Sequence, residues 1–137
     1  MYIYMNIKQI GKRKDVIDKV PFIYEKKPKT LRELIADTVT ICVNDYVMRM
    51  EKGQSVIDQE AMDDMASVGK IAFGIIYGER KPDVQEAIDA AIAGFRDGLF
   101  RVFLNDEEIE ELDESINFRE GDVVTFIRLT MLAGRIW

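Results

Sequence analysis

The side chains with the greatest capacity for chemistry lie in one acidic run between residues 106 and 114. The run contains Asp106, Glu107, Glu108, Glu110, Glu111, Asp113 and Glu114. Carboxylate oxygens that converge can bind a hard cation, and a carboxylate surface can face a basic partner. The glycine-containing pattern of a calcium-binding loop is absent, so we predict no metal site. Two interpretations stay open: charges that protect a strand edge from pairing, and a partner surface formed by Glu107, Glu108, Glu110 and Glu111.

The residue types that the chain lacks exclude several classes of site. None of its 137 residues is histidine, which removes Ser-His-Asp triads and histidine metal ligands. The one cysteine, Cys42, excludes an internal disulfide and a cysteine-only zinc site. Cys42 falls on the apolar side of an expected helix, so we predict a small buried side chain rather than a nucleophile. We expect no catalytic residue, no metal ligand and no cofactor, and therefore no enzyme.

The net charge of −6 makes phosphate backbones poor partners for this chain. The N-terminal part is nevertheless basic, with Lys8, Lys12, Arg13, Lys14, Lys19, Lys26, Lys27 and Lys29. Single-strand binders interleave such charges with aromatic rings; that pattern is not evident here, so we favour a solvated hairpin and expect no nucleic acid. No run reaches transmembrane length, and no signal-peptide pattern opens the sequence. We expect a cytoplasmic protein without membrane contact.

The N-terminal part predicts two strands and a helix. Residues 1–10 alternate with period 2, which predicts a strand. Residues 20–25 predict a second strand, and Pro21 favours a sheet edge because proline cannot donate to the ladder. Thr30 and Glu33 form a capping box, in which the hydroxyl accepts the Glu33 N–H and the carboxylate reaches back to Thr30. The helix is expected to end near Gly53 and to bury a stripe of Leu31, Leu34, Ile35, Val39, Cys42, Tyr46 and Met50.

The C-terminal part predicts three strands. Residues 100–104 and 108–112 are expected to pair across a turn at Asn105-Asp106. Residues 123–132 follow a Gly121-Asp122 turn and are rich in β-branched and aromatic side chains, which predicts a strand. Both sides of this strand are largely apolar, so we predict that it lies inside the sheet and is at least partly covered on both faces.

Residues 54–98 predict a helical hairpin inserted between the main helix and the third strand. One helix is expected within residues 57–77, and a second is expected to begin at Pro82 and to end near Gly98. The second helix has the cleanest amphipathic stripe in the chain. We predict that this stripe is buried against residues 57–77 and the sheet; its members include Val84, Ile88, Ile92 and Phe95.

This order of elements resembles the ubiquitin-like β-grasp superfamily, especially its sulfur-carrier branch. The matching motifs are the helix opening at 30–34, the turns at Asn105-Asp106 and Gly121-Asp122, and the tail at Ala133-Gly134. The resemblance implies an α+β fold in which a helix packs across a mixed sheet, with strand 123–132 parallel to strand 1–10. It implies a single domain over residues 1–137, with a β-grasp core of 1–53 and 99–134 and a helical insertion of 54–98.

In ubiquitin-like proteins a sheet face commonly receives partners, and the resemblance therefore implies a candidate surface here. Its expected members are Tyr2, Tyr4, Phe126 and Arg128, with Phe103 beside them. The alternative interpretation is that the inserted helices cover this face, since their apolar stripes need a surface to pack on.

Three functional hypotheses follow. The first, implied by the resemblance, is a non-enzymatic cytoplasmic adaptor that binds a protein partner, as a monomer or a weak homo-oligomer. The second is a sulfur carrier or ubiquitin-like modifier that an adenylating enzyme activates after processing to Gly134. The third is a small-molecule-binding domain with a pocket between the insertion and the sheet.

The tail discriminates between the first two hypotheses. Sulfur carriers end in a free Gly-Gly, because their chemistry occurs on the terminal carboxylate and a tail without side chains can enter a narrow active site. In this chain Ala133 stands in the place of the first glycine, and Gly134 is followed by Arg135, Ile136 and Trp137. We predict that the intact chain is not activated at its terminus, and that Ile136 and Trp137 pack on the domain or on a partner.

Overall fold

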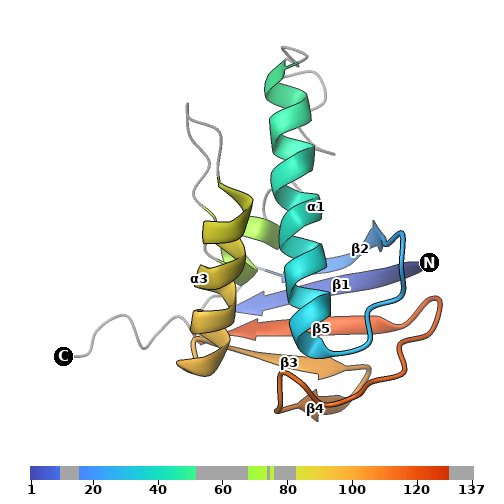
Figure 1. Cartoon of the computed structure of the whole chain (residues 1–137). Helices are drawn as coiled ribbons and strands as arrows, with labels where there is room; N and C mark the ends of the chain where they lie inside the picture. Colours follow the sequence, from blue (N-terminus) through green and yellow to red (C-terminus); the bar gives the residue numbers. More distant parts are fainter. Residues whose placement is uncertain (10–15, 52–67, 74, 76–82, 130–137) are drawn as a thin grey trace.

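The computed structural model is α+β, as predicted, with a mixed five-stranded sheet and helices over one of its faces (Figure 1). It describes residues 1–9, 16–51, 68–73, 75 and 83–129. The strands are β1 (Tyr2–Gln9), β2 (Val16–Ile23), β3 (Phe100–Leu104), β4 (Glu107–Ile109) and β5 (Val123–Arg128). The helices are α1 (Leu31–Glu51), the π-helix η2 (Val68–Ala72) and α3 (Val84–Arg96). Among the described residues, no helix has the length and apolar character needed to cross a membrane.

The strand order is β2-β1-β5-β3-β4, with β5 in the middle. Strand β5 runs parallel to β1, from Tyr4 opposite Val123 to Gln9 opposite Arg128, and antiparallel to β3. This confirms the predicted interior position and parallel pairing of the last strand. Strand β2 lies at an edge, where Pro21 costs the sheet no ladder bond.

Element boundaries differ from the predictions in several places. Strand β2 begins at Val16, four residues earlier than expected, and β4 ends at Ile109 rather than at residue 112. The predicted end of β5 at residues 130–132 lies outside the described residues, as does the predicted helix stop at Gly53. Strand ends depend on the partner strand as well as on local residue preference, which explains why these boundaries are hard to predict.

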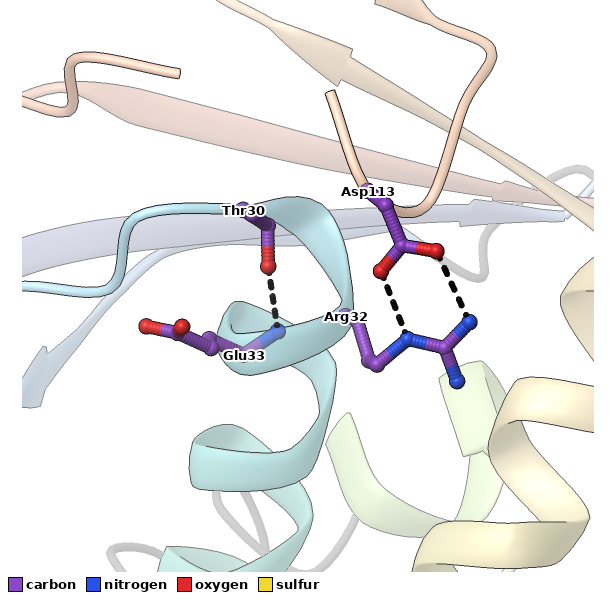
Figure 2. A network of polar contacts seen from close by, with 4 residues as sticks. All are labelled: Thr30, Arg32, Glu33 and Asp113. Carbon is purple, nitrogen blue, oxygen red and sulfur yellow. Dashed lines mark hydrogen bonds and ion pairs between the residues drawn. The ribbon is translucent and has the colours of Figure 1, made fainter. Parts of the chain in front are cut away.

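Helix α1 begins as the capping residues predict, with one change. The Thr30 Oγ1 accepts the Glu33 N–H at 3.1 Å (Figure 2). The Glu33 carboxylate accepts the Lys29 N–H at 3.0 Å instead of the predicted Thr30 N–H. Most of the expected apolar stripe is confirmed as core: Leu31, Leu34, Ile35, Val39 and Cys42 are buried, and Tyr46 is half-buried.

Helix α3 confirms the second predicted helix of the insertion but begins later. Asp83 is its N-cap and accepts the Glu86 N–H at 3.1 Å, so the helix starts at Val84 rather than at Pro82. Its end is closed by Gly98, whose φ of 76° is accessible to glycine without strain and whose N–H donates to the Phe95 carbonyl. Helix α3 packs mainly against α1 and also contacts β3 (Figure 1).

The other half of the predicted helical hairpin is different. Most of residues 57–77 lie outside the described residues, and residues 68–72 form a short π-helix rather than an α-helix. The α3 stripe is only partly buried: Ile92 is 7% exposed, while Val84, Ile88 and Phe95 are half-buried at the edge of the core.

Among the described residues, the core lies on one face of the sheet. On this face Phe100 and Phe126 approach each other with ring centroids 5.7 Å apart, and Phe73 from the end of the η2 segment contacts both at 5.9 and 5.1 Å. These rings belong to one core cluster with Ile3, Met5 and Ile7 of β1 and with Leu34, Ile35 and Val39 of α1. Helices α1 and α3 and η2 lie on this same side of the sheet. On the other face Val123, Thr125 and Ile127 of β5 are half-buried, and the prediction that this face is partly covered stays a prediction.

Candidate protein-interaction surface

The sheet face opposite the helices, here called the open face, carries a mixture of apolar, aromatic and charged side chains. Side chains alternate between the two faces of a strand, so the register assigns each residue to one of them. The open face comprises Tyr2, Tyr4, Asn6, Lys8, Pro21, Ile23, Arg101, Phe103, Glu108, Val123, Thr125 and Ile127. Every one of these residues is exposed or half-exposed, whereas most of their neighbours along the strands are buried.

Two tyrosines form the aromatic part of the open face. The Tyr2 and Tyr4 rings contact edge to face, with centroids 5.4 Å apart. The Tyr2 hydroxyl lies over the turn at Gly121, 3.7 Å from where a Cβ would stand, and Gly121 has a φ of 83° that favours glycine. The Glu120 carboxylate accepts the Tyr2 N–H at 3.0 Å, which anchors the turn to the start of β1. The rings are therefore held by the backbone around them.

Ile23 is the most exposed large apolar side chain of the open face, at 74%, and it was missed by the sequence-based site prediction. It lies opposite Tyr2 in the β1–β2 register. The sequence could have indicated this position. Side chains alternate along the expected strand at 20–25, so Ile23 lies on the same face as Pro21 and opposite to Phe22, which is buried. Ile23 extends the Tyr2–Tyr4 pair into an apolar area.

Phe126 and Arg128 do not belong to this surface, contrary to the prediction. Phe126 pairs with Ile7 across β1 and with Val102 across β3, and it is fully buried on the helix side. Arg128 shares that side, where its Nη1 approaches the Ala72 carbonyl at 3.4 Å. The register of β5 places Val123, Thr125 and Ile127 beside the tyrosines instead. Phe103 does lie on the open face, half-buried.

The acidic run lies along β4 and the segment that follows it. Glu107, Glu108, Glu110 and Glu111 are all exposed, at or just after β4. Glu108 lies on the open face, with its Oε2 4.0 Å from the Arg101 Nε. Glu108, Glu110 and Glu111 together line a cleft of about 820 Å³ beside α3, with Arg96 and Arg101. Three of the four acidic residues of the predicted surface therefore lie at one cleft, and Glu108 also belongs to the open face.

Residues 110–118 form a strap that crosses the start of α1. The Leu112 carbonyl accepts the Arg32 N–H at 2.9 Å, and the Lys29 carbonyl accepts the Ile116 N–H at 2.8 Å. The guanidinium of Arg32 donates to both carboxylate oxygens of Asp113, at 2.8 and 3.1 Å (Figure 2). This contact lowers the pKa of Asp113 and raises the pKa of Arg32. Both groups are solvent-accessible, so the pair fastens the strap rather than forming a buried site.

Two polar groups beneath α1 are buried and satisfied. The Thr38 Oγ1 donates to the Leu34 carbonyl at 2.6 Å, which leaves it to accept from the Tyr24 hydroxyl at 2.7 Å. Burial raises the pKa of Tyr24 well above its ordinary value, so the phenol stays protonated. Burial also raises the pKa of the Cys42 thiol to about 12, which confirms the prediction of a buried, weakly reactive cysteine.

The remaining predicted residues lie beyond what the structure describes. The candidate tail site, formed by Gly134, Arg135, Ile136 and Trp137, is outside the described residues, so its predictions stay predictions. In the part of the chain that the structure describes, no group of three or more Cys, Asp or Glu side chains is arranged to hold a metal ion.

Comparison of the chain with models of protein families, with curated proteins and with solved structures gives no match in any of the three.

Proposed function

We propose that the chain is a non-enzymatic adaptor of the ubiquitin-like β-grasp type, which binds a folded protein partner through its open face. The fold supports this proposal in two ways. The parallel pair β1 and β5 lies in the middle of a mixed sheet, and α1 lies across one face of that sheet (Figure 1). Both features are what the β-grasp resemblance implies.

One observation carries the choice of surface: large apolar side chains of the open face are exposed, with all described helices packed on the opposite side. Tyr2 is 37% and Ile23 74% exposed. Tyrosine is favoured in protein interfaces because its apolar ring can be buried while its hydroxyl forms hydrogen bonds at the hydrated rim. Lys8 and Arg101 flank the apolar area on one side, and Glu120 lies on the other. The expected partner presents an apolar centre between an acidic and a basic rim.

The experiment compares two substitutions that add the same charge to exposed apolar positions. Ile23→Asp is placed on the open face, and Met48→Asp is its control on α1, where Met48 is 53% exposed. Affinity capture from the native cells identifies a candidate partner, and titration calorimetry with both purified proteins then measures binding. We expect Ile23→Asp to weaken binding at least tenfold (roughly 1.4 kcal/mol) and Met48→Asp to leave it unchanged. Equal effects of the two substitutions would contradict the proposed surface.

The sulfur-carrier hypothesis depends on Gly134 and the residues after it, which lie outside the described residues. Intact-mass spectrometry of protein from the native cells tests it directly. A species that ends at Gly134 and bears a thiocarboxylate would replace the adaptor proposal, whereas full-length mass throughout would support the adaptor.

A further inference from the structure

The open face carries opposite charges at its two ends. At one end the registers place Lys8 and Arg101 on either side of Ile127. At the other end Asp106 lies in the turn that joins β3 to β4, and Glu120 is held against the start of β1 through its bond to the Tyr2 N–H. All four charged side chains are exposed. The ends are separated by about four to six residues of strand, or roughly 13–20 Å.

Other charges near these ends reduce the difference but do not reverse it. Glu108 of β4 also lies on the open face, with its Oε2 4.0 Å from the Arg101 Nε, and it offsets one of the two positive charges of the basic end. Asp18 and Lys19 of β2 are adjacent and opposite in sign; they lie beside the middle of the face, where the Lys19 N–H donates to the Asn6 Oδ1 at 2.7 Å. Arg119 and Asp122 are likewise opposite in sign at the acidic end, where the Arg119 N–H donates to the Asp122 carboxylate. The row between the ends is uncharged on the three inner strands, because Asn6, Thr125 and Phe103 lie side by side there.

A surface with this pattern is complementary to itself under one two-fold rotation. An axis that lies in the interface, perpendicular to the strands and over the Thr125 row, brings each basic end over the acidic end of the other copy. Lys8 then faces the Tyr2–Tyr4 rings and Glu120, and Arg101 faces Asp106. A two-fold axis parallel to the strands would place each basic end on itself, which like-charge repulsion disfavours.

We infer that a second copy of this chain docks on the open face in a two-fold, face-to-face dimer with antiparallel strands. The inference rests on the proposed function and adds a regulation to it. The dimer covers the surface that the partner needs, so partner binding competes with self-association. Sheets that pack face to face in this way keep their strands within about 30° of each other.

The size of the face predicts a weak dimer. Five strands spaced by about 4.8 Å, and about six residues of strand, give a face of roughly 19 by 20 Å. A standard stable interface buries about 800 Å² on each partner. The open face is smaller than that, so we expect a reversible, concentration-dependent dimer in which the charges set the orientation more than the affinity.

The test uses two charge-reversed variants of the full chain. Lys8→Glu with Arg101→Glu makes both ends acidic, and Asp106→Lys with Glu120→Lys makes both ends basic. The control, Lys29→Glu with Arg96→Glu, changes the net charge as the first variant does, but on exposed residues at the start of α1 and the end of α3. Sedimentation velocity at low salt covers total concentrations from about 10 μM to about 1 mM, the range of a weak complex.

The expected results separate the inference from its rivals. The wild type and the control should dimerise reversibly. Each charge-reversed variant alone should need at least tenfold higher concentration to dimerise to the same extent. An equimolar mixture of the two charge-reversed variants should dimerise at least as well as the wild type. A wild type that is monomeric throughout, or charge-reversed variants that dimerise like the control, would overturn the inference.

Two further outcomes keep the test decisive. Circular dichroism shows whether each charge-reversed variant folds. If one does not, a dilution series of the wild type, monitored by ¹H–¹⁵N spectra, replaces the experiment with the variants. Shifts at Phe103, Thr125 and Ile127 would support the dimer, and shifts confined to α1 or α3 would overturn it. A monomeric chain that still binds its partner through the open face overturns the dimer alone. A chain that dimerises, but whose partner binding is unchanged by Ile23→Asp, supports the dimer and removes the proposed function.

Discussion

The same strands form both faces of the sheet, but one face packs into the core and the other is exposed to solvent. On the helix side, Phe100, Phe126 and Met5 are at most 2% exposed and hold the elements together. On the open face, their immediate neighbours Arg101, Ile127 and Tyr4 remain in contact with solvent. The alternation of side chains lets one strand contribute to stability and to recognition without compromise between them. Substitutions on the two faces should therefore separate folding from binding.

The largest effect is expected for Phe126→Ala. Its ring is fully buried and contacts both Phe73 and Phe100, so its removal leaves a cavity among aromatic rings. We expect a loss of about 3–5 kcal/mol in the free energy of unfolding, measured by urea titration. Ile127→Ala, one residue along the strand on the open face, is the matched control. If the two substitutions cost the same, the two faces do not differ in the way described here.

A smaller effect is expected for Thr38→Val, which keeps the volume but removes the acceptor of the Tyr24 hydroxyl. The phenol is then buried without a partner, and we expect a loss of about 1–3 kcal/mol. Tyr24→Phe removes the donor instead and leaves the bond from Thr38 to the Leu34 carbonyl intact, so it should cost less. A double-mutant cycle by urea unfolding gives the coupling of the pair. A coupling of zero would mean that the two groups act independently.

A still smaller, pH-dependent effect is expected at the strap. The pKa of Asp113 in the folded chain is lowered by Arg32, so the pair stabilises the fold above the unfolded-state pKa of about 3.9. This contribution is lost as the pH falls through the lower folded-state pKa. Asp113→Asn should therefore lower the melting temperature slightly near neutral pH, and the difference from the wild type should disappear in acid. A difference that is constant with pH would assign the effect to something other than the ion pair.

The smallest effect on stability is expected for Ile23→Ser on the open face. This side chain is 74% exposed at an edge strand, so the free energy of unfolding should change by no more than about 0.5 kcal/mol. The same substitution should weaken partner binding, because it removes an apolar side chain from the proposed contact. Thermal melting and titration with the partner measure the two quantities. A strong loss of stability would show that Ile23 supports the fold after all.

Much of the fold can be predicted because local patterns and tertiary structure agree. The period-2 alternation correctly predicts strand β1, and the Thr30 cap with the apolar stripe correctly predicts the start of helix α1. The strand predicted at residues 100–104 has the same bounds as β3. The burial of Cys42 also follows from its position on the α1 stripe. In each case, side-chain periodicity and the packed face point to the same answer.

The composition of the open face could not be predicted as well, because it depends on register. Both sides of residues 123–128 are apolar, so only the pairing of Tyr4 with Val123 shows that Val123 rather than Phe126 joins the tyrosines. A shift of one residue would exchange the two faces. The contact of Arg32 with Asp113 joins residues 81 positions apart, and no local sequence pattern predicts it.

The central place of β5 has a consequence for synthesis on the ribosome. Strand β1 is made before its inner neighbour β5, which follows more than a hundred residues later in the chain. Until residues 123–128 emerge, no strand lies between β1 and β3, and the aromatic side chains of the core cannot pack against β5. Such long-range pairing slows folding and exposes apolar surface meanwhile. The nascent chain is therefore open to chaperones and proteases until β5 has been made.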